Sequence, residues 1–305
     1  MKRITWLLLC AALFLFAGCN SDDAQKPTVS NEKPIRIGFM ICDSYELSKA
    51  RFAPFTAYLS EKTGRKFEMI LANTFEFEDL IKEDKIDFFH VNSIVSIVLK
   101  ERFNAELLGV DIRGRNGYKA TGTIISRKDS GIETIDDMHG KSMIFGPAMA
   151  PFGYMAQYSL LLEKGFDPDV DLSTYAIPAG AAKHDKVLYG VFYGKYDVGA
   201  APRIDLDRMI NEHIFTENDF NIIVESEPMP YCTIGARDSV PQALRDQVKE
   251  LALNLKKDES VLVDGEVLKV LDRMLLDGFA PVVDSEYDII RENLKRANMA
   301  PYRKF

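Results

Sequence analysis

A strand, a loop of small residues and a helix follow one another near the middle of this chain, and this unit is well suited to bind a ligand. Residues 142–145 are predicted to form a buried strand, Gly146 and Pro147 open the loop, and a helix from Phe152 to Lys164 stops before Gly165. The first N–H groups of a helix lack internal acceptors, and its dipole is positive there. The unit therefore predicts an anion site. Because the loop carries no nucleophile, binding is favoured over catalysis.

Residue patterns typical of enzymes are missing from the sequence. It contains no G-x-S-x-G, no P-loop, no H-E-x-x-H and no G-x-G-x-x-G. There is no Cys-x-x-Cys, and the histidines are scattered rather than spaced as metal ligands, at His90, His139, His184 and His213. We therefore expect a protein that is not an enzyme and that holds no metal or cofactor.

The N-terminus has the pattern of a bacterial lipoprotein signal. Lys2 and Arg3 precede an apolar run from Ile4 to Phe16, and two small residues then lead to Cys19. The run is too short to span a bilayer comfortably, which counts against an ordinary membrane anchor. We expect a signal peptide over residues 1–18, lipidation of the Cys19 thiol, and a flexible polar tether over residues 19–33.

The length of the chain indicates how many lobes to expect, and its net charge limits the classes of partner. The mature chain of 287 residues fits two lobes better than one core. Without the signal it has 36 basic and 46 acidic residues, a net charge of about −10. This balance argues against nucleic acid as a partner and against a general attraction of anions, so a bound anion would need a local site.

Strands and helices alternate in two groups that are joined by two crossings of the chain. We predict a lobe I from residues 34–119 and 231–305, and a lobe II from residues 120–230. Lobe I opens as a βαβαβ series whose short strands suit a mostly parallel sheet, with strands at 34–41, 66–71, 86–91 and 107–110 and helices at 47–62, 75–82 and 94–102. Lobe II is predicted to hold further strands at 174–177, 198–200 and 221–224 and helices at 183–193 and 203–210. An α/β fold of this kind binds ligands in the cleft between the lobes, at the ends of the sheets.

Cys42 and Cys232 are the two cysteines expected in the mature chain besides the lipidated one. The first predicted strand ends at Cys42, and the segment that returns to lobe I passes through Cys232, so both lie at predicted edges of the cleft. Outside the cytoplasm disulfides persist. Three states stay open: two unrelated buried thiols, a disulfide, or thiols that contact a soft ligand.

The order of several short motifs resembles the phosphonate-binding (PhnD-like) family of solute-binding proteins, which feed ABC transporters. The family pattern D-L-x-G-K, strand, F-G-D-P-x-S-T-S-G, helix, G-x-D-P is matched by Asp137–Lys141, Phe145-Gly146, Gly153-Tyr154 and Gly165–Pro168. The segment Gly278–Arg291 is similar to the family's closing motif. Together these matches run from Ile35 to Arg291. The resemblance implies the two-lobe fold of periplasmic binding proteins.

Three residues acquire ligand-binding roles from this resemblance. His184 stands where the family has a histidine that touches the anion, and partial protonation would add charge there. Asp197 matches an acidic residue that faces a ligand amine in relatives, and Tyr118 matches a crossover tyrosine that can bind through its phenol. The alternatives are a capping or solvated histidine, an ordinary carboxylate at a strand end, and hinge packing of the tyrosine.

The anion loop departs from the family at the S-T-S triplet, where this chain has Ala150, Pro151 and Phe152. Each lost hydroxyl donor is worth about 0.5–1.5 kcal/mol, and more when charge-assisted. We therefore expect weak binding of simple alkylphosphonates. Backbone N–H groups of Gly153 and Tyr154, with His184, would hold a smaller or less charged group.

These observations predict a lipid-anchored, extracytoplasmic, monomeric protein that captures a small ligand. An oxyanion such as phosphate, phosphite or a phosphonate is the first candidate, delivered to the permease of an ABC importer. The alternative is a ligand-sensing partner of a membrane sensor kinase, for another oxyanion such as an arsenic species.

Overall fold

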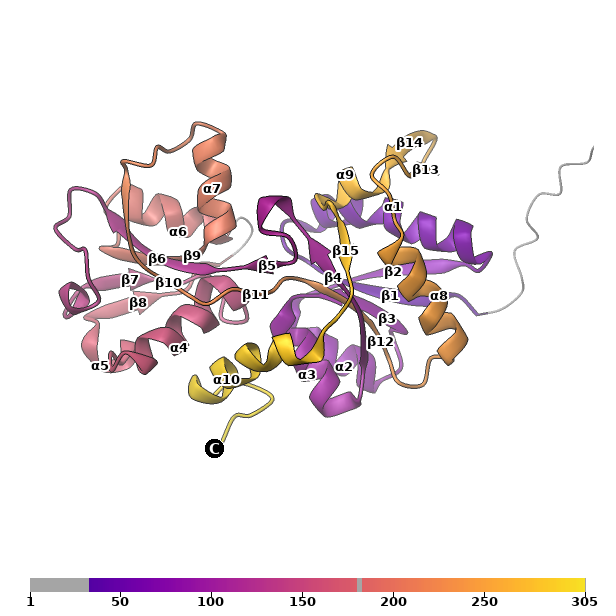
Figure 1. The fold of residues 1–305 in the computed structure, drawn as a ribbon, viewed down its shortest axis with the longest axis horizontal. Helices are drawn as coiled ribbons and strands as arrows, with labels where there is room; N and C mark the ends of the chain where they lie inside the picture. The colour runs from indigo at the N-terminus through magenta and orange to yellow at the C-terminus, as the bar shows by residue number, and fades with distance from the viewer. Residues whose placement is uncertain (1–32, 180–182, 305) are drawn as a thin grey trace, which may run out of the picture.

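The computed structural model describes residues 33–179 and 183–304, which form two α/β lobes, each built around its own sheet (Figure 1). One sheet has six strands in the order β15-β4-β12-β3-β1-β2, and the other has five in the order β10-β6-β9-β7-β8. The chain crosses between the lobes twice, and the crossing segments pair with each other, β5 (Lys119–Ala120) antiparallel to β11 (Met229–Pro230). The predicted two-lobe α/β fold is confirmed.

The sheet of the first lobe is parallel on one side and antiparallel on the other. Its strands are β1 (Ile35–Met40), β2 (Phe67–Ala72), β3 (Phe88–Val91), β4 (Glu106–Ile112), β12 (Thr233–Ala236) and β15 (Gly278–Ala280). β1 pairs in parallel with β2 and β3, but β12 inserts between β3 and β4 and runs antiparallel to both, and β15 runs antiparallel to β4. The prediction that most strands of this sheet pair in parallel is therefore wrong. The two strands that follow the second lobe, β12 and β15, run opposite to the strands of the βαβαβ series.

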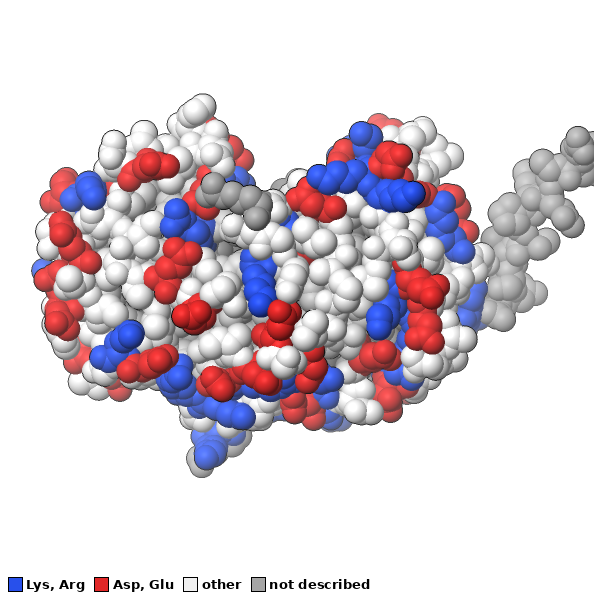
Figure 2. All heavy atoms as spheres, viewed as in Figure 1, with Lys and Arg blue, Asp and Glu red and all other residues white. Residues whose placement is uncertain are grey.

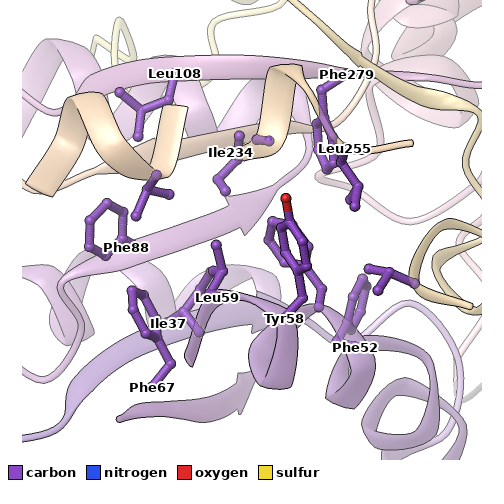
Figure 3. Packing of buried hydrophobic residues seen from close by; sticks show 14 of the residues in the cluster. Ile37, Phe52, Tyr58, Leu59, Phe67, Phe88, Leu108, Ile234, Leu255 and Phe279 are labelled. Carbon is purple, nitrogen blue, oxygen red and sulfur yellow. The ribbon is translucent and has the colours of Figure 1, made fainter. Parts of the chain in front are cut away.

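Helices cover both faces of this sheet, and each face has its own core. The helices are α1 (Tyr45–Thr63), α2 (Phe77–Lys82), α3 (Ser93–Phe103), α8 (Gln242–Leu253) and α9 (Val270–Met274), with a hairpin of β13 (Ser260–Val263) and β14 (Glu266–Lys269). Figure 3 shows Phe52, Tyr58 and Leu59 of α1 directed at the strands. The rings of Phe39 and Phe52 stack with centroids 4.5 Å apart. Each fully buried side chain of this size contributes about 1.5–3 kcal/mol.

Local caps fix where the helices beside the cleft begin. Ser44 accepts the N–H of Leu47 at 3.2 Å and starts α1, and Gly64 ends it with a positive φ of 68°. Asn92 accepts the N–H of Val95 at 3.0 Å and starts α3. These caps position the residues that follow the ends of β1 and β3.

The second lobe repeats the arrangement on a smaller scale. Its strands are β6 (Gly122–Arg127), β7 (Ser142–Ile144), β8 (Thr174–Ala176), β9 (Val198–Pro202) and β10 (Phe220–Glu225). Its helices are α4 (Ala156–Glu163), α5 (Pro168–Asp171), α6 (Lys183–Phe192) and α7 (Arg203–Asn211). Two buried clusters, one around Phe145 and one around Val187, pack the helices on its two faces.

The helix predicted from Phe152 begins differently. A π-helical turn, Pro151–Met155, precedes α4, and the N–H groups of Tyr154 and Met155 both donate to the carbonyl of Ala150, at 3.2 and 3.1 Å. The buried Gln157 amide donates to the Phe152 carbonyl at 2.5 Å. A single regular helix over 152–164 is therefore wrong at its first turn, because the Gln157 amide takes the Phe152 carbonyl and the N–H of Ala156 donates to Pro151 instead.

A C-terminal helix that the sequence patterns did not predict, α10 (Asp288–Arg296), lies against both lobes (Figure 1). Arg291 pairs with Glu101 of α3 at 3.0 Å. On the other side Arg296 donates to Ser159 of α4 at 2.9 Å, and Ser159 donates to Asn293 at 2.9 Å. The helix thus links α3 of the first lobe to α4 of the second.

The predicted signal peptide, the lipidation site Cys19 and nearly all of the tether lie outside the described residues. Among the residues that are described, no helix is both long enough and apolar enough to cross a bilayer. On the face shown in Figure 2, basic and acidic side chains are intermixed rather than gathered by sign. This face therefore offers no field of one sign that would attract an anion.

Candidate ligand-binding cleft

A cavity of about 430 Å³ lies between the lobes, where β1, β3 and β4 end and the loop before α4 faces them. The first lobe contributes Cys42, Arg51, His90, Asp111, Arg113 and Cys232 to its wall. The second lobe contributes Phe152, Lys183, His184, Asp185, Asp205 and Arg208. Its size is that of a small-molecule site, for which about 300–1,000 Å³ is usual. The position agrees with the rule that open α/β sheets bind ligands at strand ends.

The structure brings five of the nine predicted ligand-binding residues to this cavity: Cys42, Ala150, Pro151, Phe152 and His184. It does not bring the other four, Tyr118, Gly153, Tyr154 and Asp197, to the wall of the cavity. Their ligand contacts stay predictions.

Each of these four has a contact elsewhere in the fold. Tyr118 donates its phenol to Glu286 at 2.9 Å, near the crossing strands. Asp197 is exposed and accepts from the hydroxyl and the N–H of Ser142, at 2.7 and 2.8 Å. Tyr154 stacks on Tyr158 with centroids 5.5 Å apart. Gly153 lies directly behind the ring of His184.

His184, near the start of α6, points a half-buried ring at two glycines. A Cβ atom at Gly153 would lie 2.6 Å from its Cε1 atom, and one at Gly146 would lie 3.0 Å from it. Within the described chain its Nδ1 atom is buried without a hydrogen-bond partner. Burial lowers the pKa of His184, partly offset by Asp205 and Asp185. The expected partial protonation is therefore disfavoured, and a neutral imidazole offers one unsatisfied nitrogen.

The loop before α4 presents an apolar wall instead of hydroxyl donors. The N–H of Tyr154, expected to hold an anion, already donates to the carbonyl of Ala150, and Pro151 has no N–H.

Phe152 stacks on Tyr231 of the first lobe with centroids 5.8 Å apart and planes 9° from parallel. Asn92 donates across the cleft to the carbonyl of Met149 at 2.9 Å. The lobes thus contact each other beside the cavity.

Charged residues in the wall differ in how far they are neutralised. Arg208 donates to Asp185 at 2.6 Å and to Glu212 at 2.9 Å. The buried Asp111 carboxylate lies 2.9 and 3.0 Å from the Nε2 atom of His90. Arg51 and Arg113, by contrast, form no ion pair with a carboxylate in the described part of the chain.

The two cysteines are free and line the same cavity. Burial raises the pKa of the Cys232 thiol well above its usual value, and the Asp111 carboxylate adds to this. The pKa of Cys42 is raised as well, mainly by desolvation at the cavity wall, although the residue is exposed to solvent. Both thiols are therefore protonated near neutral pH.

Sequence reasoning missed Arg51, Arg113 and Asp111 as wall residues. Asp111 lies near the end of β4 and Arg113 follows it directly. Because open α/β sheets bind ligands at the ends of their strands, both residues could have been identified from the sequence. Arg51 lies in the middle of α1, where nothing in the sequence distinguishes it from other exposed helical arginines.

Comparison with known proteins matches the chain to one family. The sequence model of the ABC transporter phosphonate periplasmic substrate-binding proteins covers residues 37–287. The chain belongs to this family. The resemblance inferred from the motifs is confirmed, and the family is one of solute-binding proteins.

Two solved structures share the fold of this chain. XAC2383 of Xanthomonas citri, bound to ATP, superposes with a TM-score of 0.71 at 18% identity, over 88% of this chain and 98% of that one. PhnD1 of Prochlorococcus marinus, in complex with methylphosphonate, gives a TM-score of 0.71 at 14% identity, over 90% and 99%. At these identities the likeness establishes the fold alone.

A curated relative combines this kind of domain with further sequence. The tetrathionate sensor histidine kinase TtrS of Salmonella typhimurium is 22% identical over 234 residues, which is 72% of this chain. The matched region spans 39% of the length of that kinase.

Proposed function

We propose that this phosphonate-type substrate-binding protein is a lipid-anchored receptor that captures a small oxyanion in its cleft and delivers it to an ABC importer. The observation that carries the proposal is the cavity of about 430 Å³, whose wall combines side chains of both lobes with two arginines, Arg51 and Arg113, that form no ion pair with a carboxylate among the described residues. Closure of two lobes on a ligand is the motion expected of this architecture.

The expected ligand differs from a plain alkylphosphonate. The wall has Ala150, Pro151 and Phe152 where hydroxyl donors would be needed, and the half-buried His184 is held in its neutral form. Phosphate, phosphite or another compact oxyanion keeps charge without needing those hydroxyls.

A thermal-shift screen tests the proposal. Full-length protein would be melted with phosphate, phosphite, methylphosphonate, arsenate and sulfate, and with neutral and cationic solutes as controls. Stabilisation follows affinity, at about 2.7 kcal/mol when the ligand is at a hundredfold excess over its dissociation constant. We expect at least one compact oxyanion to shift the melting temperature more than methylphosphonate does. If no solute of any charge shifts it, the receptor function is wrong.

Membrane attachment is tested separately by labelling cells with palmitate. The labelled band should disappear in Cys19→Ala, while the matched change Cys42→Ala should keep it. An unlabelled wild-type protein released in soluble form would contradict the lipid anchor.

A sensing role is the second candidate; the 22% identity to the sensor kinase over 72% of this chain agrees with it but does not favour it over transport. The two roles differ in the membrane partner. Ligand-loaded protein that stimulates ATP hydrolysis by a permease–ATPase complex in proteoliposomes would support transport. Ligand-dependent change in kinase autophosphorylation, without such stimulation, would support sensing.

A further inference from the structure

Two arginines of the first lobe face the cavity with most of their hydrogen-bonding capacity unused. A guanidinium has five N–H donors. Arg51 uses its Nε group on the carbonyl of Met274 at 3.0 Å, and Arg113 uses Nη1 on the phenol of Tyr231 at 2.8 Å. The structure shows no other hydrogen bond from either side chain to a described residue. By contrast Arg208, on the second lobe, is engaged by two carboxylates.

The side chains around these arginines do not cancel their charge. Both arginines act on the titration of Cys42 and of Cys232, so all four groups share one region of the wall. Because the pKa values of both thiols are raised, neither cysteine supplies a thiolate counter-ion near neutral pH. The Asp111 carboxylate lies 2.9 Å from the Nε2 atom of His90 and forms no ion pair with either arginine.

Two further charges bear on this region of the wall. Asp43, beside Cys42, is exposed to solvent, which screens its charge. For Arg113 itself, burial opposes the charge, but Tyr231 and Asp205 outweigh it and the pKa is raised, so the guanidinium stays charged.

The second lobe is poorly equipped to hold the same charge. The loop before α4 has no hydroxyl side chain at residues 150–152, and the N–H of Tyr154 already donates to the carbonyl of Ala150. His184 is neutral, and of the two cations that the described residues place on that side of the cavity, Arg208 is paired with carboxylates, which leaves Lys183.

We infer that the anion subsite of this cavity lies on the first lobe, where the guanidinium groups of Arg51 and Arg113 bind a small oxyacid anion beside the thiols of Cys42 and Cys232. The inference rests on the proposed function and adds the place and the chemistry of recognition. Guanidinium groups bind carboxylate, phosphate and sulfate groups through paired, charge-assisted hydrogen bonds. Protonated thiols next to them contribute weak donors and a polarizable surface.

The test measures binding by calorimetry with full-length protein and four probe anions, phosphate, phosphite, sulfate and acetate, at constant ionic strength. For the anion that binds tightest, Arg51→Gln and Arg113→Gln should each weaken affinity by about 10- to 100-fold, the range expected for hydrogen bonds to a charged group. Lys49→Gln removes a positive charge from the same helix α1 at an exposed position outside the cavity, and should leave affinity unchanged. Arg51→Lys and Arg113→Lys keep the positive charge but lose the planar set of N–H donors of the guanidinium group. Each should weaken affinity by an intermediate amount.

A second readout follows the reactivity of a thiol instead of the heat of binding. The bound anion should slow alkylation of Cys42 by iodoacetamide at pH 8.5, followed by peptide mass spectrometry, and this protection should disappear in Arg51→Gln. Melting temperatures of all variants verify that they are folded.

Three outcomes separate this inference from the function on which it rests. If an anion binds the arginine variants as tightly as the wild type, while Lys183→Gln or His184→Ala abolishes binding, the anion lies on the second lobe and the inference is overturned. If no anion binds but a neutral or cationic solute does in the thermal-shift screen, the inference and the oxyanion ligand fail, while the role as a solute receptor stands. If no solute of any kind binds, both fail.

Discussion

Replacing Phe152 with serine should lower stability and raise phosphonate affinity at the same time. The side chain is 4% exposed and stacks on Tyr231 across the cleft. Truncating a buried phenylalanine costs about 3–5 kcal/mol. The aromatic pair accounts for about 0.5–1.5 kcal/mol of interaction beyond burial. Against a total stability of about 5–15 kcal/mol for a typical domain, this loss is large but leaves a folded protein in the upper part of that range.

The gain in affinity comes from restoring a hydroxyl at a position where the family motif has one. A new donor to the anion is worth about 0.5–1.5 kcal/mol, which corresponds to about a 2- to 12-fold tighter complex. Phe152→Ala removes the same ring without adding a donor, so it is the matched control. The comparison of serine with alanine therefore isolates the hydroxyl from the space and lobe mobility that loss of the ring creates.

Urea unfolding of the three proteins would measure the stability change, and calorimetric titration with methylphosphonate would measure affinity. We expect serine and alanine to be similarly destabilised, and serine to bind more tightly. Equal affinity of the two variants would refute the argument that hydroxyl loss in this loop determines phosphonate rejection. A loss of stability below about 1 kcal/mol would refute the importance of the buried stack with Tyr231.

Three further predictions follow from single contacts. Gly153→Ala places a Cβ atom 2.6 Å from the ring of His184, so the ring must move; we expect about 1–3 kcal/mol of destabilisation in urea and weaker ligand binding. Because burial lowers the pKa of His184 in the folded protein, the unfolded state binds a proton at higher pH. The free energy of unfolding of the wild type should therefore fall as pH drops below about 6.5. Urea titrations from pH 7.5 to 4.5 would measure this fall, which should be less steep in His184→Gln. Arg296→Ala removes its ion pair with Glu163 and its hydrogen bond to Ser159; we expect a loss of about 1 kcal/mol and faster amide exchange in α10, while unchanged exchange would contradict the link between the lobes.

Most of the secondary structure could be predicted because it depends on neighbours in sequence. The strand 34–41 is observed as Ile35–Met40, and the helix 183–193 as Lys183–Phe192. Helix ends were marked by residues such as Asn92, whose short side chain caps a backbone N–H three positions later. The exception, the π-helical turn before α4, depends on a side chain, Gln157, that reaches back to the Phe152 carbonyl.

The candidate site was predicted only in part. His184 and the loop 150–152 were found because a family motif marks them, and both line the cavity. Asp197 shared that kind of support, yet its carboxylate accepts two bonds from Ser142 and lies away from the cavity wall. A motif fixes the position of a residue in the chain, whereas the direction of its side chain depends on the strand beside it.

The sequence by itself therefore determined the two alternating α/β groups and the family, because hydrophobic periods, caps and motif order act over short stretches of chain. Only the tertiary structure decided that β12 enters between β3 and β4, which brings Cys232 to the same cavity as Cys42. It also decided that Arg51 and Arg113 remain without carboxylate partners among the described residues. The neutralisation of a charge depends on which side chains meet in space, and here those side chains come from segments that lie far apart in the sequence.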